Sequence, residues 1–166
     1  QHGPVSVFNF RSEGIGRASR ALPQVGVEWS QDETLLDRYI DHIYVQGGQT
    51  TLLDAIHFMA DELNAKVDAD KNAFGGKVII VVTDGEDRVS TINEKNLIKV
   101  LRESGVTVYA VGLVSDLDSD RGLIRKAPRD TAIDFLKSLT KGTGGGVIFP
   151  KGDQPAIDAL LGGLLH

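Results

Sequence analysis

Two periods of apolar and polar positions alternate along the chain, and each predicts one kind of element. Short runs rich in β-branched and aromatic residues predict strands, and apolar positions three and four residues apart predict helices. Strands are expected at residues 5–10, 24–29, 77–83, 106–114 and 146–150. Helices are expected through residues 35–43, 51–65, 93–104, 130–141 and 153–165. Residues 11–22, 67–76 and 115–129 are expected to be loops.

This order of elements predicts an α/β fold, because strands that alternate with helices form parallel crossover units. The continuous apolar run Lys77–Thr83 is typical of a strand covered on both faces, so we expect it to be central and buried. The class expected is a three-layer Rossmann-like sheet, mostly parallel with one antiparallel edge strand, and with helices on both faces. Residues 1–166 are expected to form a single domain.

Two turns of the sequence carry helix-end signals. Ser30 and Glu33 have the spacing of a capping box, which predicts that Ser30 caps the helix that follows. Gly105 follows the helix expected at residues 93–104 and is typical of a helix C-terminus.

Composition narrows the class of partner. The net charge of −5 disfavours nucleic acid and anionic membrane surfaces, which attract basic proteins. No apolar run is as long as the roughly 18 residues of a membrane span, so we expect no membrane insertion. Without cysteine, thiolate chemistry is excluded. Gln1 is not expected to be the natural start, which leaves room for a removed signal; a secreted or periplasmic location is favoured over a cytoplasmic one.

Candidate chemistry lies where strands of such a sheet end, because ligands bind beyond their carboxyl ends. Asp84 directly follows the apolar run, and Thr50 ends a glycine-containing loop that opens a helix. Carboxylate and hydroxyl oxygens suit Mg²⁺, Mn²⁺ or Ca²⁺. Each residue also has a structural alternative: Asp84 as a turn residue before glycine, and Thr50 as a helix cap.

Taken together, the segments GGQTTLLDAI, KVIIVVTDGED, VTVYAVGL and GTGGGVIFP resemble the von Willebrand factor A family in order and spacing. They are more similar to its bacterial members than to integrins. Thr50 matches the family's second metal motif through Asp54-Ala55-Ile56, with Thr51 as the adjacent alternative. Asp84 matches the third.

The resemblance implies a metal-dependent adhesion or scaffolding module rather than an enzyme. Thr50 and Asp84 would ligate a divalent ion, most often Mg²⁺, directly or through water. A protein partner would offer a carboxylate to that ion and contact Gln49, Glu86 and Asp87.

One departure from the family is large. Its first metal motif, D-x-S-x-S, occurs nowhere in the sequence. Residues 5–10 and 24–29 fit the family's second and third strands, so its first strand is expected to be missing and to be supplied by a further N-terminal segment or by another chain. Two ligands do not make a site, and we therefore expect weak Mg²⁺ binding by this chain alone.

Two alternatives stay open. One is a metal-dependent hydrolase or phosphotransferase that uses Asp84, Glu86 and Asp87. The other is a scaffold of the same fold that binds no metal. A calcium loop at residues 116–120 is disfavoured, because its glycine falls one place late and no downstream glutamate follows. His57 is interpreted as a structural residue.

Overall fold

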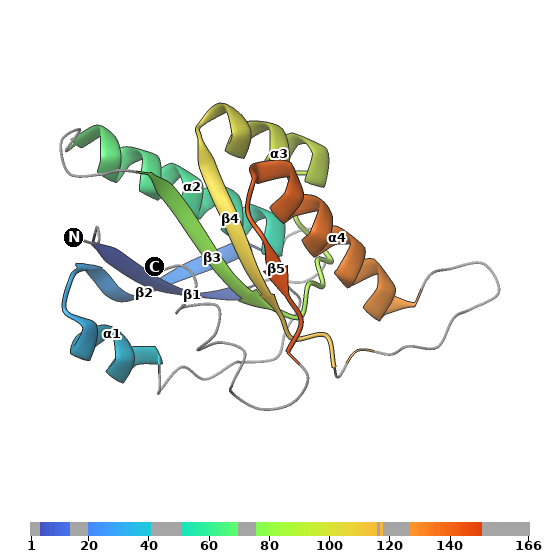
Figure 1. Ribbon diagram of the computed structural model, residues 1–166, viewed down its shortest axis with the longest axis horizontal. Coiled ribbons are helices and arrows are strands. Elements are labelled where there is room, and N and C mark those ends of the chain that lie inside the picture. The colour runs from blue at the N-terminus through green and yellow to red at the C-terminus, as the bar shows by residue number, and fades with distance from the viewer. Residues whose placement is uncertain are drawn as a thin grey trace.

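The computed structural model describes residues 4–13, 20–40, 51–69, 76–115, 117 and 127–150. Its elements alternate between strands and helices (Figure 1). In order they are β1 (Val5–Glu13), β2 (Arg20–Ser30), α1 (Glu33–Ile40), α2 (Leu52–Ala69), β3 (Lys77–Thr83), α3 (Glu94–Glu103), β4 (Val106–Gly112), α4 (Pro128–Thr143) and β5 (Val147–Ile148). The chain therefore has the α/β class that its sequence predicts, and the helix expected at residues 153–165 lies outside the described residues.

The strands form two sheets. β1 and β2 pair in an antiparallel hairpin, while β3, β4 and β5 form a parallel sheet in the order β3-β4-β5. Lys77 of β3 lies opposite Val106 of β4, and the pairing continues without a shift to Thr83 and Gly112. Among the described residues β1 does not pair with β3, which agrees with the expectation that a strand of the family is missing between them. The two sheets are thus separate within the part of the chain that the structure describes.

The hairpin is longer than its apolar pattern suggests. The prediction of a loop over residues 11–22 was wrong at both ends, because β1 continues to Glu13 and β2 begins at Arg20, while residues 14–19 lie outside the described residues. Glu13 lies opposite Arg20 in this extension. Backbone hydrogen bonds between strands do not require apolar side chains, so a polar segment can continue a ladder that an apolar one begins.

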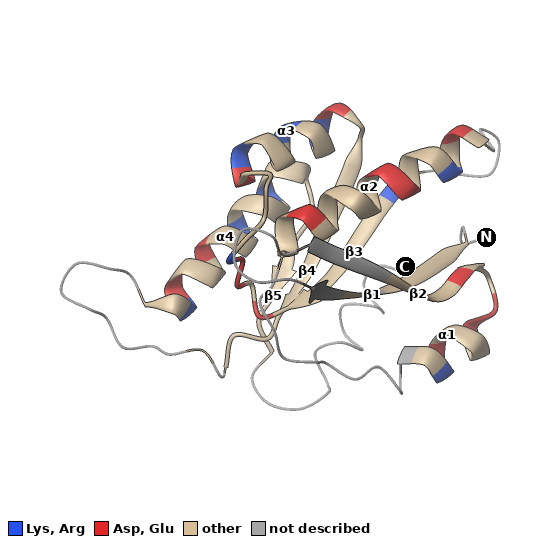
Figure 2. Cartoon of the chain, turned by 180° about the vertical axis from the view of Figure 1, so that it is seen from behind, with Lys and Arg blue, Asp and Glu red and all other residues tan. Residues whose placement is uncertain are grey.

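The core lies on one face of the parallel sheet. α2, α3 and α4 lie on the same side of β3 and β4, behind them in Figure 1 and in front of them in Figure 2. Ile79 and Val108 are register partners and point into this layer. The largest buried cluster contains Leu52, Leu53, Ile56, Ala60, Leu63, Ile79, Leu97, Leu101, Val106, Val108 and Leu139.

The hairpin carries helices on both of its faces. On one face, Phe8 and Phe10 lie against Phe58 of α2, with ring centroids 6.5 and 6.0 Å away. On the other face, the ring of Tyr39 in α1 lies directly over Gly26 of β2, where a side chain would have no room. Helices thus cover both faces of the hairpin, whereas α2, α3 and α4 lie on one face of the parallel sheet, and α2 contacts both sheets.

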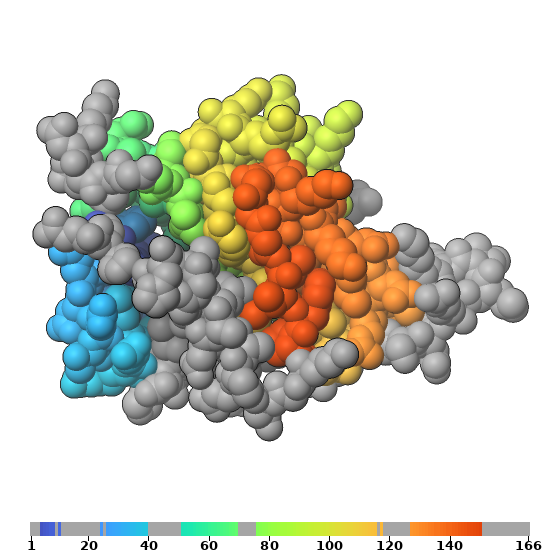
Figure 3. All heavy atoms as spheres, in the orientation of Figure 1, coloured from blue at the N-terminus to red at the C-terminus, as the bar shows by residue number. Residues whose placement is uncertain are grey.

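β3 is not buried on both faces, and this prediction was wrong. Ile79 is 8% exposed on the helix-covered face, whereas the residues that alternate with it, Val78, Ile80 and Val82, are 49, 43 and 56% exposed. β3 is also an edge strand of its sheet rather than a central one. In Figure 3 the atoms of β3 and β4 reach the surface on this near face. The exposed stripe lies on the face opposite the helix layer, and among the described residues β3 has a partner strand on one side only.

Helix ends follow local hydrogen bonds. At α1 the predicted capping residue was wrong: Asp32 Oδ1 accepts from Leu35 N at 3.2 Å, while Ser30 Oγ accepts from Asp32 N. Asn93 caps α3 by accepting from Asn96 N at 2.9 Å. Gly105, at φ +68°, ends that helix as predicted.

The helix surfaces are mixed in charge. Figure 2 shows acidic and basic residues interspersed along α2, α3 and α4. Among the described residues, no helix combines the length and apolar character needed to cross a membrane.

Candidate functional site

The loop that follows β3 is a tight turn built around Asp84. Asp84 Oδ1 accepts from the backbone N–H of Glu86 at 3.0 Å, and Thr83 Oγ1 accepts from Gly85 N at 3.1 Å. Gly85 has φ +79°, a left-handed conformation that favours glycine. A Cβ at Gly85 would lie 3.0 Å from the Cβ of Ala132 in α4. Sterics and side-chain bonds together therefore hold Asp84 at the carboxyl end of β3.

The two acidic residues after Gly85 have partners within the chain. Glu86 Oε2 accepts from Arg88 Nη2 at 2.8 Å. Asp87 Oδ1 accepts from the backbone N–H of Leu53 at 3.2 Å and from Ser90 Oγ at 2.5 Å. Because Leu53 lies in the first turn of α2, Asp87 satisfies one of the free N–H groups at that helix start.

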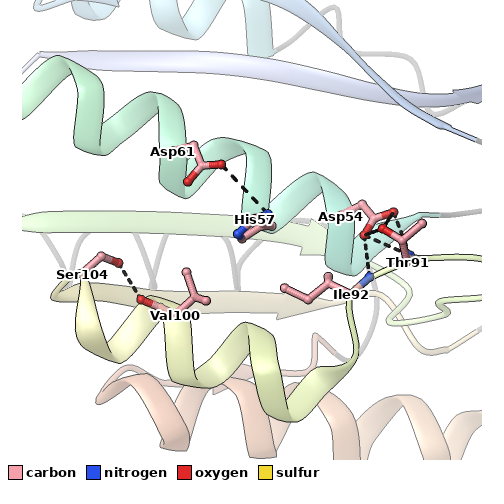
Figure 4. A network of polar contacts seen from close by, with 7 residues as sticks. All are labelled: Asp54, His57, Asp61, Thr91, Ile92, Val100 and Ser104. Carbon is pink, nitrogen blue, oxygen red and sulfur yellow. Dashed lines mark hydrogen bonds and ion pairs between the residues drawn. The ribbon is translucent and has the colours of Figure 1, made fainter.

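Asp54 makes the reciprocal contact from α2 to the loop (Figure 4). Both of its carboxylate oxygens accept from the backbone N–H of Thr91, at 3.1 and 2.9 Å. They also accept from Thr91 Oγ1, at 3.0 and 3.2 Å, and Oδ1 accepts from Ile92 N at 3.0 Å. In return, Ser90 Oγ accepts from Asp54 N at 3.2 Å. We name the set Asp54, Asp87, Ser90 and Thr91 the clasp.

The clasp holds the loop of Asp84 against the start of α2, so two of the predicted motifs lie at one edge of the sheet. We name this edge the rim, and it consists of residues 84–92 and the first turn of α2. Thr51 immediately precedes α2, and its carbonyl accepts from Ala55 N at 3.0 Å. Thr50 and Gln49 lie outside the described residues. Their proximity to Asp84 therefore stays a prediction, although the adjacent start of α2 lies against the loop of Asp84.

The oxygen atoms around Asp84 are of the type that binds a divalent ion, but the described residues supply too few of them. Asp84 Oδ2 accepts no hydrogen bond from the described residues, and a carboxylate oxygen suits Mg²⁺. The described ranges hold no group of three or more His, Asp or Glu side chains placed to bind one ion. Glu86 and Asp87 already accept hydrogen bonds from Arg88 and from the clasp. A complete ion site at Asp84 would therefore need donors beyond these residues.

Sequence reasoning missed the roles of Asp54, Ser90 and Thr91. Asp54 was noticed only as part of the motif that contains Thr50, and the serine–threonine pair carries no apolar period. His57 lies on α2 with Nδ1 4.0 Å from Asp61 Oδ2, one helical turn away. Both side chains lie at the surface of the helix, and the structural role of His57 stays a prediction.

Comparison with known proteins identifies the domain type. The von Willebrand factor type A domain matches residues 17–143. No curated protein matches the chain.

Two solved structures share the fold. One is the conserved hypothetical protein BatB from Bacteroides thetaiotaomicron, at 16% identity and a TM-score of 0.54, covering 87% of this chain and 73% of that one. The other is an aerotolerance-related membrane protein from Bacteroides fragilis, at 17% identity and a TM-score of 0.51, covering 86% and 72%. At such identities the similarity establishes the fold alone.

Proposed function

The chain belongs to the von Willebrand factor type A domain family, and we propose on this premise that the rim is its binding site for a protein partner. The family consists of protein-interaction and adhesion-type modules that are generally not enzymes. The observation that carries the proposal is the arrangement at the rim, where the loop of Asp84 is tied to the start of α2 and Asp84 Oδ2 is left without a described partner.

In this proposal Asp84 and Thr50 hold a divalent ion, Mg²⁺ before Mn²⁺ or Ca²⁺, and the ion takes a carboxylate from the partner. Thr51 ranks second to Thr50, because Thr51 is 2% exposed and already makes an interaction within the chain. Gln49, Glu86 and Asp87 would flank the partner. Of these, Glu86 is the better candidate for contact, because its bond to Arg88 is exposed, whereas the bonds of Asp87 to Leu53 and Ser90 are partly buried.

The missing donors would come with a strand that pairs with the free edge of β3. Alternate residues of a parallel strand direct their backbone N–H and C=O groups to opposite sides, so half of those on β3 face away from β4. The exposed stripe of Val78, Ile80 and Val82 borders this edge and would be covered in part by such a strand. A further N-terminal segment or another chain would supply it.

Titration calorimetry with Mg²⁺ tests the ion site. The wild-type chain should bind weakly, and Asp84→Asn should abolish what binding there is. Glu62→Gln is the matched control, since Glu62 is an exposed carboxylate on α2. Weak binding that survives in Asp84→Asn would contradict the site. Tight binding by the chain alone that depends on Glu86 and Asp87 would instead favour the hydrolase alternative, and no binding at all would favour a scaffold without metal.

A further inference from the structure

We infer that Asp54 is a positioning residue of the rim, which acts through Thr91 and Ile92 to hold the loop of Asp84 in place. The effect of Asp54 on ion binding rests on the proposed function, whereas its role in holding the loop does not. Asp54 itself does not bond to residues 84–86. Asp54 can therefore affect Asp84 only by holding the residues between them in place. Loss of its bonds should loosen the loop as far back as Asp84, and this can be measured.

The geometry divides the clasp into a strong and a weak half. Asp54 uses both carboxylate oxygens, and three different groups donate to them: Thr91 N, Thr91 Oγ1 and Ile92 N. Asp87 uses Oδ1 alone for its two donors, Leu53 N and Ser90 Oγ. Both halves use a carboxylate, the stronger class of acceptor, so they differ in the number of bonds: Asp54 has three donors on two oxygens, and Asp87 has two donors on one.

The same chemical change should consequently have unequal effects at the two positions. In Asp54→Asn, an amide oxygen at the Oδ1 position can still accept from Thr91 N, Thr91 Oγ1 and Ile92 N, but the NH₂ group then takes the Oδ2 position, 2.9 Å from Thr91 N, so a donor meets a donor there. In Asp87→Asn, the amide can keep its remaining oxygen where Oδ1 lies and retain both bonds. Both variants remove one negative charge, so a general charge effect cannot explain a difference between them.

The position of the clasp explains why this matters for the rim. Residues 84–92, which include Asp87, Ser90 and Thr91 of the clasp, form no regular element, and α3 begins only at Glu94. The loop is anchored at one end by the turn at Gly85 and at the other by Asp54. When the second anchor is lost, the turn at Asp84 is left tied only at β3 and by the weaker half of the clasp.

Amide hydrogen exchange of the whole chain is the decisive measurement. For Asp54→Asn, exchange should rise roughly tenfold or more at Thr91 and Ile92, because bonds to a charged group are lost. Exchange should also rise at Glu86, whose N–H donates to Asp84. Asp87→Asn should change Glu86 less. A rise confined to Thr91 and Ile92, with Glu86 unchanged, would show that Asp54 is only a local structural residue and overturn the inference.

A milder variant provides a test in case Asp54→Asn does not fold. Thr91→Val removes the hydroxyl bonds to Asp54 and keeps both backbone N–H bonds, so Glu86 should exchange faster than in wild type and slower than in Asp54→Asn. Asp61→Asn, which changes an exposed carboxylate about two turns further along α2, is the matched control and should leave Glu86 unchanged. An unchanged Glu86 in Thr91→Val would count against the inference even if Asp54→Asn does not fold.

Mn²⁺ binding, followed by its electron paramagnetic resonance signal, separates this inference from the proposed function. If wild type binds Mn²⁺, Asp54→Asn should weaken binding more than Asp87→Asn does. If wild type does not bind Mn²⁺, the proposed ion site fails, while exchange at Glu86 still decides whether Asp54 positions the loop.

Discussion

β3 and β4 are parallel neighbours of equal length and similar apolar composition, yet their environments differ. β4 lies between β3 and β5, and Val106, Val108, Ala110 and Val111 are each at most 2% exposed. On β3 only Ile79 is buried, and every second residue is exposed to solvent. The difference has two sources. The exposed residues of β3 lie on the face away from the helices, and among the described residues β4 pairs on both edges and β3 on one.

This comparison indicates that the sequence of β3 is suited to an environment more enclosed than the one that the described residues provide. Strands that face water on one side usually alternate apolar and polar residues, and β3 does not. A stripe of Val78, Ile80 and Val82 beside an unpaired edge is also a common site of unwanted association. We interpret both features as the signature of a partner strand.

The largest expected effect contrasts adjacent isoleucines on the two faces of β3. Ile79→Ala should cost about 2–4 kcal/mol of unfolding free energy, because it leaves a cavity in the core. Ile80→Ala removes the same atoms from a side chain that is 43% exposed and should cost about 1 kcal/mol or less. Urea denaturation of both variants measures the difference. Equal losses would mean that both faces of β3 are covered.

The next contrast uses a glycine beside each strand. A Cβ at Gly112, at the end of β4, would lie 2.6 Å from the ring of Phe149 and 3.0 Å from Leu136 Cδ1, so Gly112→Ala should cost about 1–3 kcal/mol. Gly76, immediately before β3, has no atom within 4 Å of such a Cβ. Gly76→Ala should change the thermal midpoint little, and a loss comparable to that of Gly112→Ala would contradict this picture of an open β3 side.

A smaller effect is expected on the exposed stripe itself. Replacing Val78, Ile80 and Val82 together by threonine keeps β-branching and should alter unfolding free energy by about 1 kcal/mol or less. The same triple variant should associate less at high concentration, as measured by light scattering, because the apolar edge is made polar. If the triple variant associates as strongly as wild type, the surface responsible for self-association lies elsewhere.

The smallest effect concerns Mg²⁺. Because the described donors are too few for a complete site, millimolar Mg²⁺ should raise the thermal midpoint of the chain by about 1 °C or less. A synthetic strand that pairs with β3 and carries additional oxygen donors should increase that shift. A large shift with Mg²⁺ alone would show that the chain already holds a full ligand set.

The class of the fold and most element positions could be predicted from apolar periods, since these depend on neighbours along the chain. The bounds of β3 and the ends of α3 are such cases. The extension of β1 to Glu13 could not be predicted, because pairing between backbones leaves no mark on polar side chains. The cap at Asp32 was missed because Ser30, Asp32 and Glu33 compete within one turn, and only geometry decides between them.

The candidate site, like the fold, could be predicted only in part from the sequence. Asp84 could be located because an acid that follows an apolar strand emerges at the carboxyl end of that strand. The clasp could not, because Asp54 and Thr91 are brought together by the packing of α2 against β3 and the loop that follows. The exposure of β3 depends on an absent neighbour, which the apolar run by itself cannot reveal.

The aromatic contact between the hairpin and α2 has a consequence for biosynthesis. Phe8 and Phe10 leave the ribosome well before Phe58, the ring on which they pack. Until α2 emerges, the nascent hairpin must display a stacked aromatic pair to the cytosol or to the export machinery. Stalled chains that end before Phe58 should therefore be bound by chaperones that recognise apolar segments, and chains that extend past β3 should release them.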